Sequence, residues 1–210
     1  MEHASNAFIQ LFPQKDIQII LRAIVLGGQT LRKKTASEKE NLITIRLHKK
    51  LIRDYPFRDG PFSIQLQPQI PLTDTDEDSI DGQIDLLVPS TLGFQTYFAI
   101  EAKRLRYISP SGQFVPGNSA YVNEGMMRFI SGQYAPFMRS GAMLGYVFDE
   151  DIQSARTGID NYIQTKCNEL KIKPPGRLKK SDIISAKVID ETHHDLASKS
   201  FIIFHLFLSV

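Results

Sequence analysis

The sequence predicts an α/β protein in which α-helices flank a mixed central β-sheet. Segments with helical spacing of apolar residues alternate with short apolar segments that are typical of strands. Apolar residues make up 42% of the 210 residues, which is enough to build a core. The predicted order of helix, β-hairpin, helix, strand, helix and strand is that of an α/β fold. We expect residues 1–34 to form an N-terminal helical segment and residues 35–210 to form a single domain.

Two helices are predicted in the first quarter of the chain. Residues 8–26 carry apolar positions at helical spacing, and Gly27-Gly28 predicts the end of that helix. Two overlapping capping-box patterns, Thr35 to Glu38 and Ser37 to Glu40, predict the start of a second helix that runs to about residue 54.

The second helix offers two apolar stripes to the sheet. Glu40 lies on the stripe of Ile43, Leu47 and Leu51, whereas Leu42, Ile45 and Ile52 form another flank. Glu38 lies about 160° away from Glu40 on helical geometry. We take the first stripe to face the sheet, and the second stays open as an alternative.

Three strands are predicted to follow. Residues 63–72 alternate polar and apolar side chains, but two prolines interrupt them and indicate an edge strand. The acidic residues 73–79 are expected to form a loop. Residues 83–88 and 94–103 each have strand character, and the short turn 89–93 between them predicts a β-hairpin.

The second half of the chain continues the alternation of helices and strands. We expect, in order, a loop over 107–118, a helix over 121–138, a strand over 142–148, a helix over 149–170, a basic loop over 171–180, and strands over 187–189 and 201–208.

Composition limits where the protein works. The single cysteine, Cys167, excludes an internal disulfide and favours a reducing compartment. The N-terminus lacks a secretory signal pattern. The apolar runs 17–26 and 201–210 are both interrupted and are shorter than the roughly 20 residues of a membrane span. We therefore expect a cytoplasmic protein with no membrane partner. The net charge of +2 does not by itself demand a nucleic-acid partner.

The most informative residues lie on the predicted hairpin. Residues i and i+2 of a strand point to the same face, so Glu101 and Lys103 project together. Asp85 lies on the preceding strand and can come beside Glu101 on that face. Two carboxylates and an ammonium group on otherwise apolar strands would be costly to bury without a purpose.

These residue types suit the hydrolysis of a phosphodiester. Paired carboxylates offer the oxygen ligands that Mg²⁺ prefers, and Mn²⁺ is expected to substitute for it. A bound metal lowers the pKa of water and stabilises charge in the transition state. The lysine can orient or deprotonate the attacking water, or neutralise developing charge.

The pattern resembles the PD-(D/E)XK nuclease superfamily, which has the restriction-endonuclease-like fold. The motif here is Ile84-Asp85, then residues 86–100, then Glu101-Ala102-Lys103, with Ile84 in place of the usual proline. The order of elements over residues 35–150 is similar to that of the superfamily. No subfamily is identified. The resemblance implies a restriction-endonuclease-like core with a mixed central sheet between helices.

The resemblance also implies a function and further ligands. The expected activity is a Mg²⁺-dependent phosphodiesterase acting on DNA, an endonuclease in restriction, defence or DNA processing. The superfamily often carries a metal-linked glutamate on its first helix. We assign that role to Glu40, with Glu38 as the runner-up. The backbone carbonyl of Ala102 is a further candidate ligand beside Asp85 and Glu101.

Several residues near the expected site are candidates for contact with substrate phosphate. Arg104 directly follows the lysine strand. The next predicted helix carries Glu124, Arg128, Gln133 and Tyr134, which are candidates either for phosphate contact or for supporting the metal ligands. The alternative for Arg128 is an ion pair with Glu124 at i+4 on an exposed face. Such basic groups give sequence-independent affinity for nucleic acid, but a basic run such as 171–180 can equally be a solvated face.

Other functions and sites remain as alternatives. His193-His194-Asp195 invites a metal or base role, but a surface loop is the simpler interpretation, and His205 is expected in a strand core or edge. The chain could be a non-catalytic nucleic-acid-binding or assembly subunit that keeps the nuclease fold. It could also be an unrelated partner-binding module that uses strand 201–210. A homodimer or an activating protein partner is left open.

Overall fold

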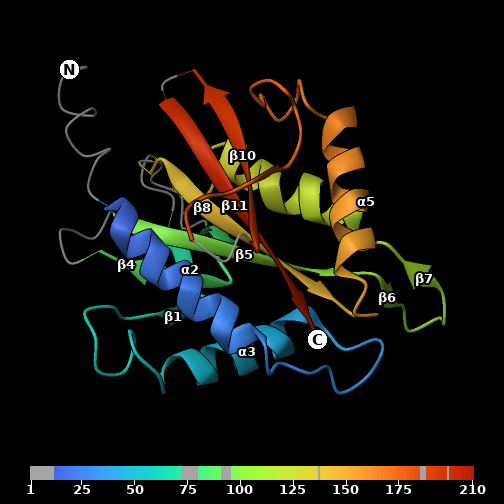
Figure 1. Cartoon of the computed structure of the whole chain (residues 1–210), viewed down its shortest axis with the longest axis horizontal. Coiled ribbons are helices and arrows are strands. Elements are labelled where there is room, and N and C mark those ends of the chain that lie inside the picture. Colours follow the sequence, from blue (N-terminus) through green and yellow to red (C-terminus); the bar gives the residue numbers. More distant parts are fainter. Residues whose placement is uncertain (1–11, 72–79, 91–95, 137, 185–187, 198) are drawn as a thin grey trace.

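A seven-stranded mixed sheet forms the centre of the molecule (Figure 1). The computed structural model describes residues 12–71, 80–90, 96–136, 138–184, 188–197 and 199–210. The sheet has the spatial order β1 (Gln65–Leu66), β4 (Leu86–Pro89), β5 (Tyr97–Leu105), β8 (Ser140–Val147), β11 (Lys199–Ser209), β10 (Ile189–Leu196) and β9 (Lys179–Lys180). Helices pack against it on both faces, which confirms the predicted α/β class.

The parallel pairs lie in the middle of the sheet. β8 runs parallel to both β5 and β11, whereas the pairs toward either edge are antiparallel. β11 is the last strand along the described chain, yet it lies between β8 and β10. Two short ribbons stand outside this sheet: β2 (Gln69–Pro71) with β3 (Ile80–Gln83), and β6 (Tyr107–Ile108) with β7 (Phe114–Val115).

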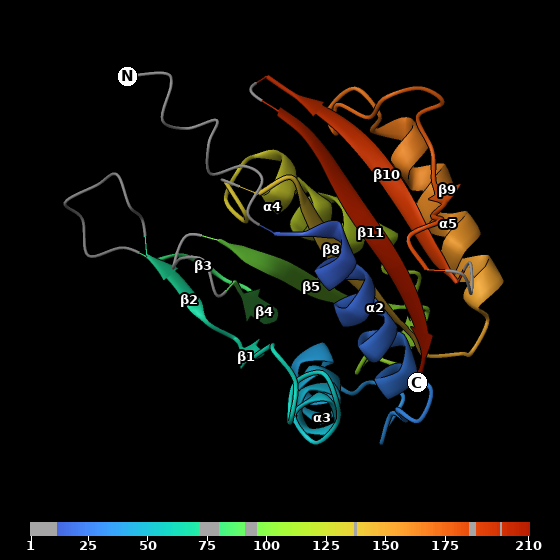
Figure 2. The ribbon, with the colours of Figure 1, turned by 60° about the vertical axis from the view of Figure 1, so that its left-hand side comes forward.

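The helices divide between the two faces of the sheet. One face packs against α2 (Gln14–Gly28) and α3 (Glu40–Leu51); in Figure 2, α2 lies in front of the strands and α3 lies below them. The other face packs against the π-helix η1 (Ala120–Met126), α4 (Met127–Ile130) and α5 (Ile152–Thr165). Each face therefore has its own apolar core.

The alternation of β5 decides which layer its polar side chains enter. Ile100 and Ala102 belong to the core under α2 and α3, whereas Ala99 and Leu105 belong to the core under η1, α4 and α5. Because neighbouring residues of a strand point to opposite faces, Glu101 and Lys103 lie on the side of η1 and α4.

The start of α3 differs from the prediction. The helix begins at Glu40, and its N-cap residue Lys39 makes no side-chain capping hydrogen bond, so neither capping box forms. The predicted stripe is confirmed: Ile43, Leu47 and Leu51 are buried, whereas Leu42 is 46% exposed. The side of this helix that faces the sheet is therefore the one that carries Ile43, Leu47 and Leu51.

The predicted helix over 121–138 is wrong in its type and its length. The segment forms a π-helix followed by one α-helical turn that ends at Ile130. Gly132 then takes a φ of +83°, a conformation that glycine adopts readily, and the chain turns back. The backbone N–H of Tyr134 donates to the carbonyl of Arg128 at 2.9 Å and closes this turn.

Other boundaries also differ. The predicted loop 107–118 contains the β6–β7 ribbon, and the predicted strand 63–72 is split between β1 and β2. His193, His194 and Asp195 lie in strand β10 rather than in a surface loop. The prediction missed this strand because polar residues dominate its sequence. The predicted loop 73–79 lies outside the described residues, as does most of the turn 89–93.

The described part of the chain contains no helix that is both long and apolar enough to cross a membrane.

Candidate active site

The site forms where β4 separates from β5. Leu86 pairs with Ile100, and the same register would place Asp85 opposite Glu101. However, β4 begins only at Leu86, and the backbone of the preceding residues bonds elsewhere. The N–H of Ile84 donates to the Pro68 carbonyl, and the Asp85 carbonyl accepts from the N–H of Gln67. The edge of β5 is therefore bared beyond Ile100.

Two carboxylates accept hydrogen bonds from the backbone N–H groups on the unpaired edge of β5. The N–H of Ala102 donates to Asp85 Oδ2 at 2.8 Å, and the N–H of Arg104 donates to Glu40 Oε2 at 3.2 Å. These N–H groups belong to residues i and i+2, so they point toward the same edge. In an extended strand the C=O of a residue points the same way as its N–H, so the Ala102 carbonyl faces this edge too. Asp85 and Glu40 each keep a second oxygen for another ligand.

Glu101 is the most deeply buried carboxylate of the cluster, at 1% exposure. Its Oε1 accepts from Lys103 Nζ at 2.6 Å and from Arg128 Nη1 at 2.9 Å. Its Oε2 is buried and accepts no hydrogen bond from a donor group, although the Glu101 carboxyl group lies within hydrogen-bonding reach of that of Asp85. A buried oxygen that lacks a donor costs free energy, so a cation at Oε2 would relieve a strain that the protein alone leaves in place.

Burial shifts the ionisation of all three carboxyl groups. Burial, and then repulsion from Asp85, raise the pKa of Glu101 to about 8, although Lys103 and Arg128 oppose the shift. Burial also raises the pKa of Asp85, against the hydrogen bond from the Ala102 N–H, and that of Glu40, against the charge of Lys103. A nearby cation would favour the charged forms and reverse these shifts.

Lys103 remains an ammonium group. Burial by itself would lower the pKa of Lys103, but attraction to Glu101 and then to Glu40 outweighs it, and the pKa lies above its ordinary value. Lys103 Nζ is 3.7 Å from Glu40 Oε1. Its stem lies against Gly125 of η1, where an added Cβ would come within 2.3 Å of Met143. The glycine therefore lets η1 approach β5 and β8 closely.

Arg128 joins the site from α4. Its Nη1 donates both to Glu101 Oε1 and, at 2.7 Å, to the hydroxyl of Tyr134. That hydroxyl donates to the backbone carbonyl of Gln83 at 2.6 Å. The alternative pairing of Arg128 with Glu124 does not form, because the guanidinium turns toward β5. The sequence offered no signal for this, because the π-helix changes the direction in which α4 presents its side chains.

Glu40 rather than Glu38 lies at the cluster. Glu38 instead holds Arg46 through two hydrogen bonds of 2.7 Å and accepts the backbone N–H of Lys34 at 2.7 Å. Glu38 therefore has a structural role, because it connects the segment before α3, at Lys34, to Arg46 on the helix.

The two remaining phosphate candidates are placed differently from Arg128. Arg104 Nη1 donates to the carbonyls of Ser37 and Glu38, and the guanidinium lies 4.0 Å from the ring centre of Tyr107. These contacts hold the entrance of α3 against β5. Gln133 is half-buried in the turn after α4, where its N–H donates to the Ser131 hydroxyl. A phosphate role for either residue stays a prediction.

The basic loop 171–180 is neutralised by acidic neighbours. The four ion pairs are Lys173 with Asp195, Arg177 with Asp160, Lys179 with Glu191, and Lys180 with Asp190. Asp160 and Asp190 are buried, so they anchor the loop to the protein. Acidic partners therefore compensate most of the basic charge of this segment.

A second polar cluster is buried away from the carboxylates. The Thr192 hydroxyl contacts both His194 Nε2 at 2.7 Å and His205 Nε2 at 2.9 Å. His205 Nδ1 contacts the Tyr121 hydroxyl at 3.0 Å, and His194 Nδ1 contacts the Leu170 carbonyl at 2.7 Å. Burial lowers the pKa of His194 to about 4 and that of His205 to about 3. Both are neutral, hydrogen-bonded core residues, as expected for His205 but not for the His193-His194-Asp195 segment.

The carboxylate cluster fits a hard divalent cation by its donor chemistry. Among the described residues, no three His, Cys, Asp or Glu side chains already stand as a ready-made metal site. Lys103 and Arg128 draw one oxygen of Glu101 toward themselves. The unpartnered Oε2 nevertheless lies beside carboxylates that supply only oxygen, the ligand type of Mg²⁺ and Mn²⁺. Asp85 interacts electrostatically with both Glu101 and Glu40, so the predicted ligands lie near one another at this edge of the sheet.

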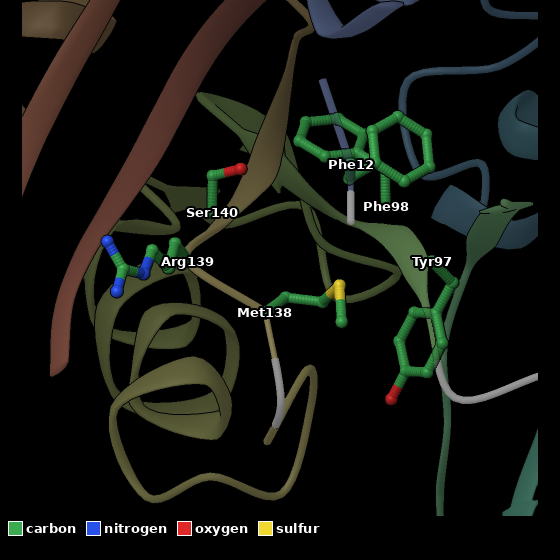
Figure 3. A pocket seen from close by; sticks show the side chains of 6 residues that line it. All are labelled: Phe12, Tyr97, Phe98, Met138, Arg139 and Ser140. Carbon is green, nitrogen blue, oxygen red and sulfur yellow. The ribbon is translucent and has the colours of Figure 1, made fainter. Parts of the chain in front are cut away.

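A small pocket lies elsewhere and shares no residue with this cluster. Figure 3 shows it at the starts of β5 and β8, lined by Phe12, Tyr97, Phe98, Met138, Arg139 and Ser140.

The comparisons with known proteins were negative: the chain matched no protein-family model, no curated protein and no solved structure at a significant level.

Proposed function

We propose that this chain is a metal-dependent nuclease with a restriction-endonuclease-like core that hydrolyses phosphodiester bonds in DNA. The observation that carries the proposal is the buried, unpartnered Oε2 of Glu101, beside Asp85 and Glu40 on the bared edge of β5. Burial disfavours the ionised form of each of these three carboxyl groups, so their gathering at one point carries an electrostatic cost. Perturbed carboxyl groups gathered at one point are typical of functional sites.

Each group of the cluster has a chemical role in this proposal. Asp85, Glu101, the Ala102 carbonyl and Glu40 would hold Mg²⁺ or Mn²⁺. Such an ion supplies Lewis acidity and a water of lowered pKa. The neighbouring carboxylates raise the pKa of Lys103, which favours its role as a charged donor that orients the nucleophile or neutralises the phosphate. The half-exposed guanidinium of Arg128 offers a cation for the phosphate beside this centre.

The order of elements supports the proposed core. An α-helix that carries Glu40 precedes an antiparallel pair of strands, a crossover containing α4, and a strand parallel to the motif strand. The choice of DNA as substrate, and of restriction, defence or DNA processing as the setting, follows from the resemblance to PD-(D/E)XK nucleases. The single cysteine favours a cytoplasmic location.

The experiment is a cleavage assay with the purified full chain. Supercoiled, linear and single-stranded DNA are incubated with Mg²⁺, Mn²⁺ or EDTA, and RNA serves as a second substrate. Asp85→Asn should abolish cleavage, because an amide can still accept the Ala102 N–H but binds metal poorly. Asp195→Asn, at an exposed acid outside the cluster, is the matched control and should cleave as the wild type does.

Two outcomes would contradict the proposal. Cleavage that persists in Asp85→Asn would indicate another site or a contaminating nuclease. Salt-dependent DNA binding without cleavage under any metal condition would instead favour the non-catalytic binding subunit.

A further inference from the structure

A series of hydrogen bonds joins β5, which carries Glu101, to the end of β3, just before Asp85. It runs from Glu101 Oε1 to Arg128 Nη1 at 2.9 Å, then to the Tyr134 hydroxyl at 2.7 Å, and then to the Gln83 carbonyl at 2.6 Å. Gln83 stands two residues before Asp85, on the segment that leaves the sheet. The series therefore bridges the opening between β5 and the segment that carries Asp85.

The bridging residues are held firmly from outside the cluster. Tyr134 is fully buried, and its ring meets that of Phe129 edge-on with centroids 5.8 Å apart. The Arg128 guanidinium lies 5.3 Å from the ring centre of Tyr134. The turn after α4 is closed by the backbone bond between the same two residues. Both side chains consequently have their positions fixed by packing as well as by hydrogen bonds.

The place of this bridge gives it a use. Main-chain pairing normally sets the spacing of two strands, but pairing between β4 and β5 stops at Leu86 and Ile100. Beyond that point the two segments are linked by the bond from the Ala102 N–H to Asp85, by the contact between the Asp85 and Glu101 carboxyl groups, and by the Arg128–Tyr134 bridge. The bridge is the link that holds Glu101 at Oε1, and it therefore contributes to the spacing of the two carboxylates.

We propose that Arg128 and Tyr134 are positioning residues that set the spacing of Asp85 and Glu101 for a divalent cation. This inference rests on the proposed metal-dependent function. Tyr134 acts through Arg128, and Arg128 acts by holding Oε1 of Glu101 so that Oε2 stays available. Partners of this kind, which orient ligands without touching the metal, commonly change metal affinity by about 10- to 100-fold when removed.

The test is a calorimetric titration of the full chain with Mn²⁺ in the absence of DNA. Tyr134→Phe removes only the hydroxyl and keeps the ring in the core, and we expect it to weaken Mn²⁺ binding by about 10-fold or more. Tyr121→Phe is the matched control, because Tyr121 is equally buried and its hydroxyl also has a buried partner, His205. This control should bind Mn²⁺ as the wild type does.

A double-mutant cycle separates positioning from a general loss of structure. Arg128→Lys keeps the charge but not the shape of the guanidinium, so the bridge to Tyr134 is lost. If Tyr134 acts through Arg128, adding Tyr134→Phe to Arg128→Lys should weaken Mn²⁺ binding little further. Additive losses would show that Tyr134 acts independently. Arg128→Lys also tests the bridge by itself if Tyr134→Phe fails to fold.

The outcomes distinguish this inference from the proposed function. If Tyr134→Phe and Arg128→Lys both bind Mn²⁺ as the wild type does while Asp85→Asn does not, the bridge has no positioning role and the metal site stands. If the wild type neither binds Mn²⁺ nor cleaves DNA, the proposed function is wrong and the inference falls with it.

Discussion

Glu38 and Glu40 stand two residues apart, and replacing each by glutamine should give opposite results. The structure places Glu38 in an ion pair with Arg46 and places Glu40 at the carboxylate cluster. Glu38→Gln should therefore lower stability and leave metal binding intact. Glu40→Gln should weaken metal binding and catalysis while leaving stability close to that of the wild type.

The expected loss in Glu38→Gln follows from the contacts. The Glu38 side chain is 5% exposed and the Arg46 side chain 25%, and Glu38 accepts three hydrogen bonds of 2.7 Å. An amide keeps one acceptor oxygen and turns an N–H group toward a donor. Leaving a partly buried charge without its partner costs about 2–3 kcal/mol. For a domain of this size that corresponds to a decrease in Tm of roughly 4–12 °C.

The expected change in Glu40→Gln is smaller. Burial raises the pKa of Glu40, so ionising this group opposes folding, and the amide removes that cost. The amide oxygen can still accept the N–H of Arg104. The ion pair with Lys103 that is lost spans 3.7 Å, and such a loose pair contributes about 1 kcal/mol or less.

Thermal unfolding with and without Mn²⁺ measures both effects at once. A ligand that binds the folded state raises Tm, so the shift caused by the metal reports affinity. We expect Glu38→Gln to have a low Tm and a full metal shift, and Glu40→Gln to have a normal Tm and a reduced shift. The reverse pattern would show that Glu38 is the metal-linked residue and that the assignment of α3 is wrong.

Three further predictions concern charge and pH. Glu101→Gln and Lys103→Ala should each abolish cleavage in the DNA assay. Because the Glu101 side chain is 1% exposed, chemical denaturation of Glu101→Gln should also show a changed free energy of unfolding. The affinity for Mn²⁺ should rise with pH until about pH 8, because Glu101 must lose its proton to bind the metal. Calorimetric titrations at constant salt test this, and an affinity that does not change with pH would refute it. The pKa values of His194 and His205 are lowered in the folded state, so the unfolded chain takes up protons first as the pH falls. The free energy of unfolding should therefore decrease from about pH 6.5 toward pH 4, by roughly 3 kcal/mol for His194 alone. In a His194→Gln variant, the free energy of unfolding should depend less on pH over this range.

The central residues of the site could be predicted from the sequence because their arrangement is local. The two-residue period of a strand places Glu101 and Lys103 on one face, and a short hairpin brings Asp85 to the same level. The helical period likewise identified the buried stripe of Ile43, Leu47 and Leu51. Both periods follow from backbone geometry and hold whatever the rest of the chain does.

The rest of the site depends on contacts that no local pattern records. Glu38 fits the last position of the predicted Thr35 to Glu38 capping box, yet it lies outside the helix, where its oxygens accept from Arg46 and from the Lys34 N–H. Arg128 lies at the right spacing to pair with Glu124, but the π-helix before it turns the guanidinium toward Glu101. In both cases a partner distant in sequence outweighs a weak local interaction of a few tenths of a kcal/mol.

The position of β11 governs when the molecule can be complete. This strand follows every other element along the described chain, yet it fills the gap between β8 and β10 in the middle of the sheet. During synthesis, β1, β4, β5 and β8 can pair with one another first, but β8 has no neighbour on its other side until residues 199–209 have emerged. The final closure of the sheet is therefore a step that follows translation of β11, and the protein reaches its native core only then.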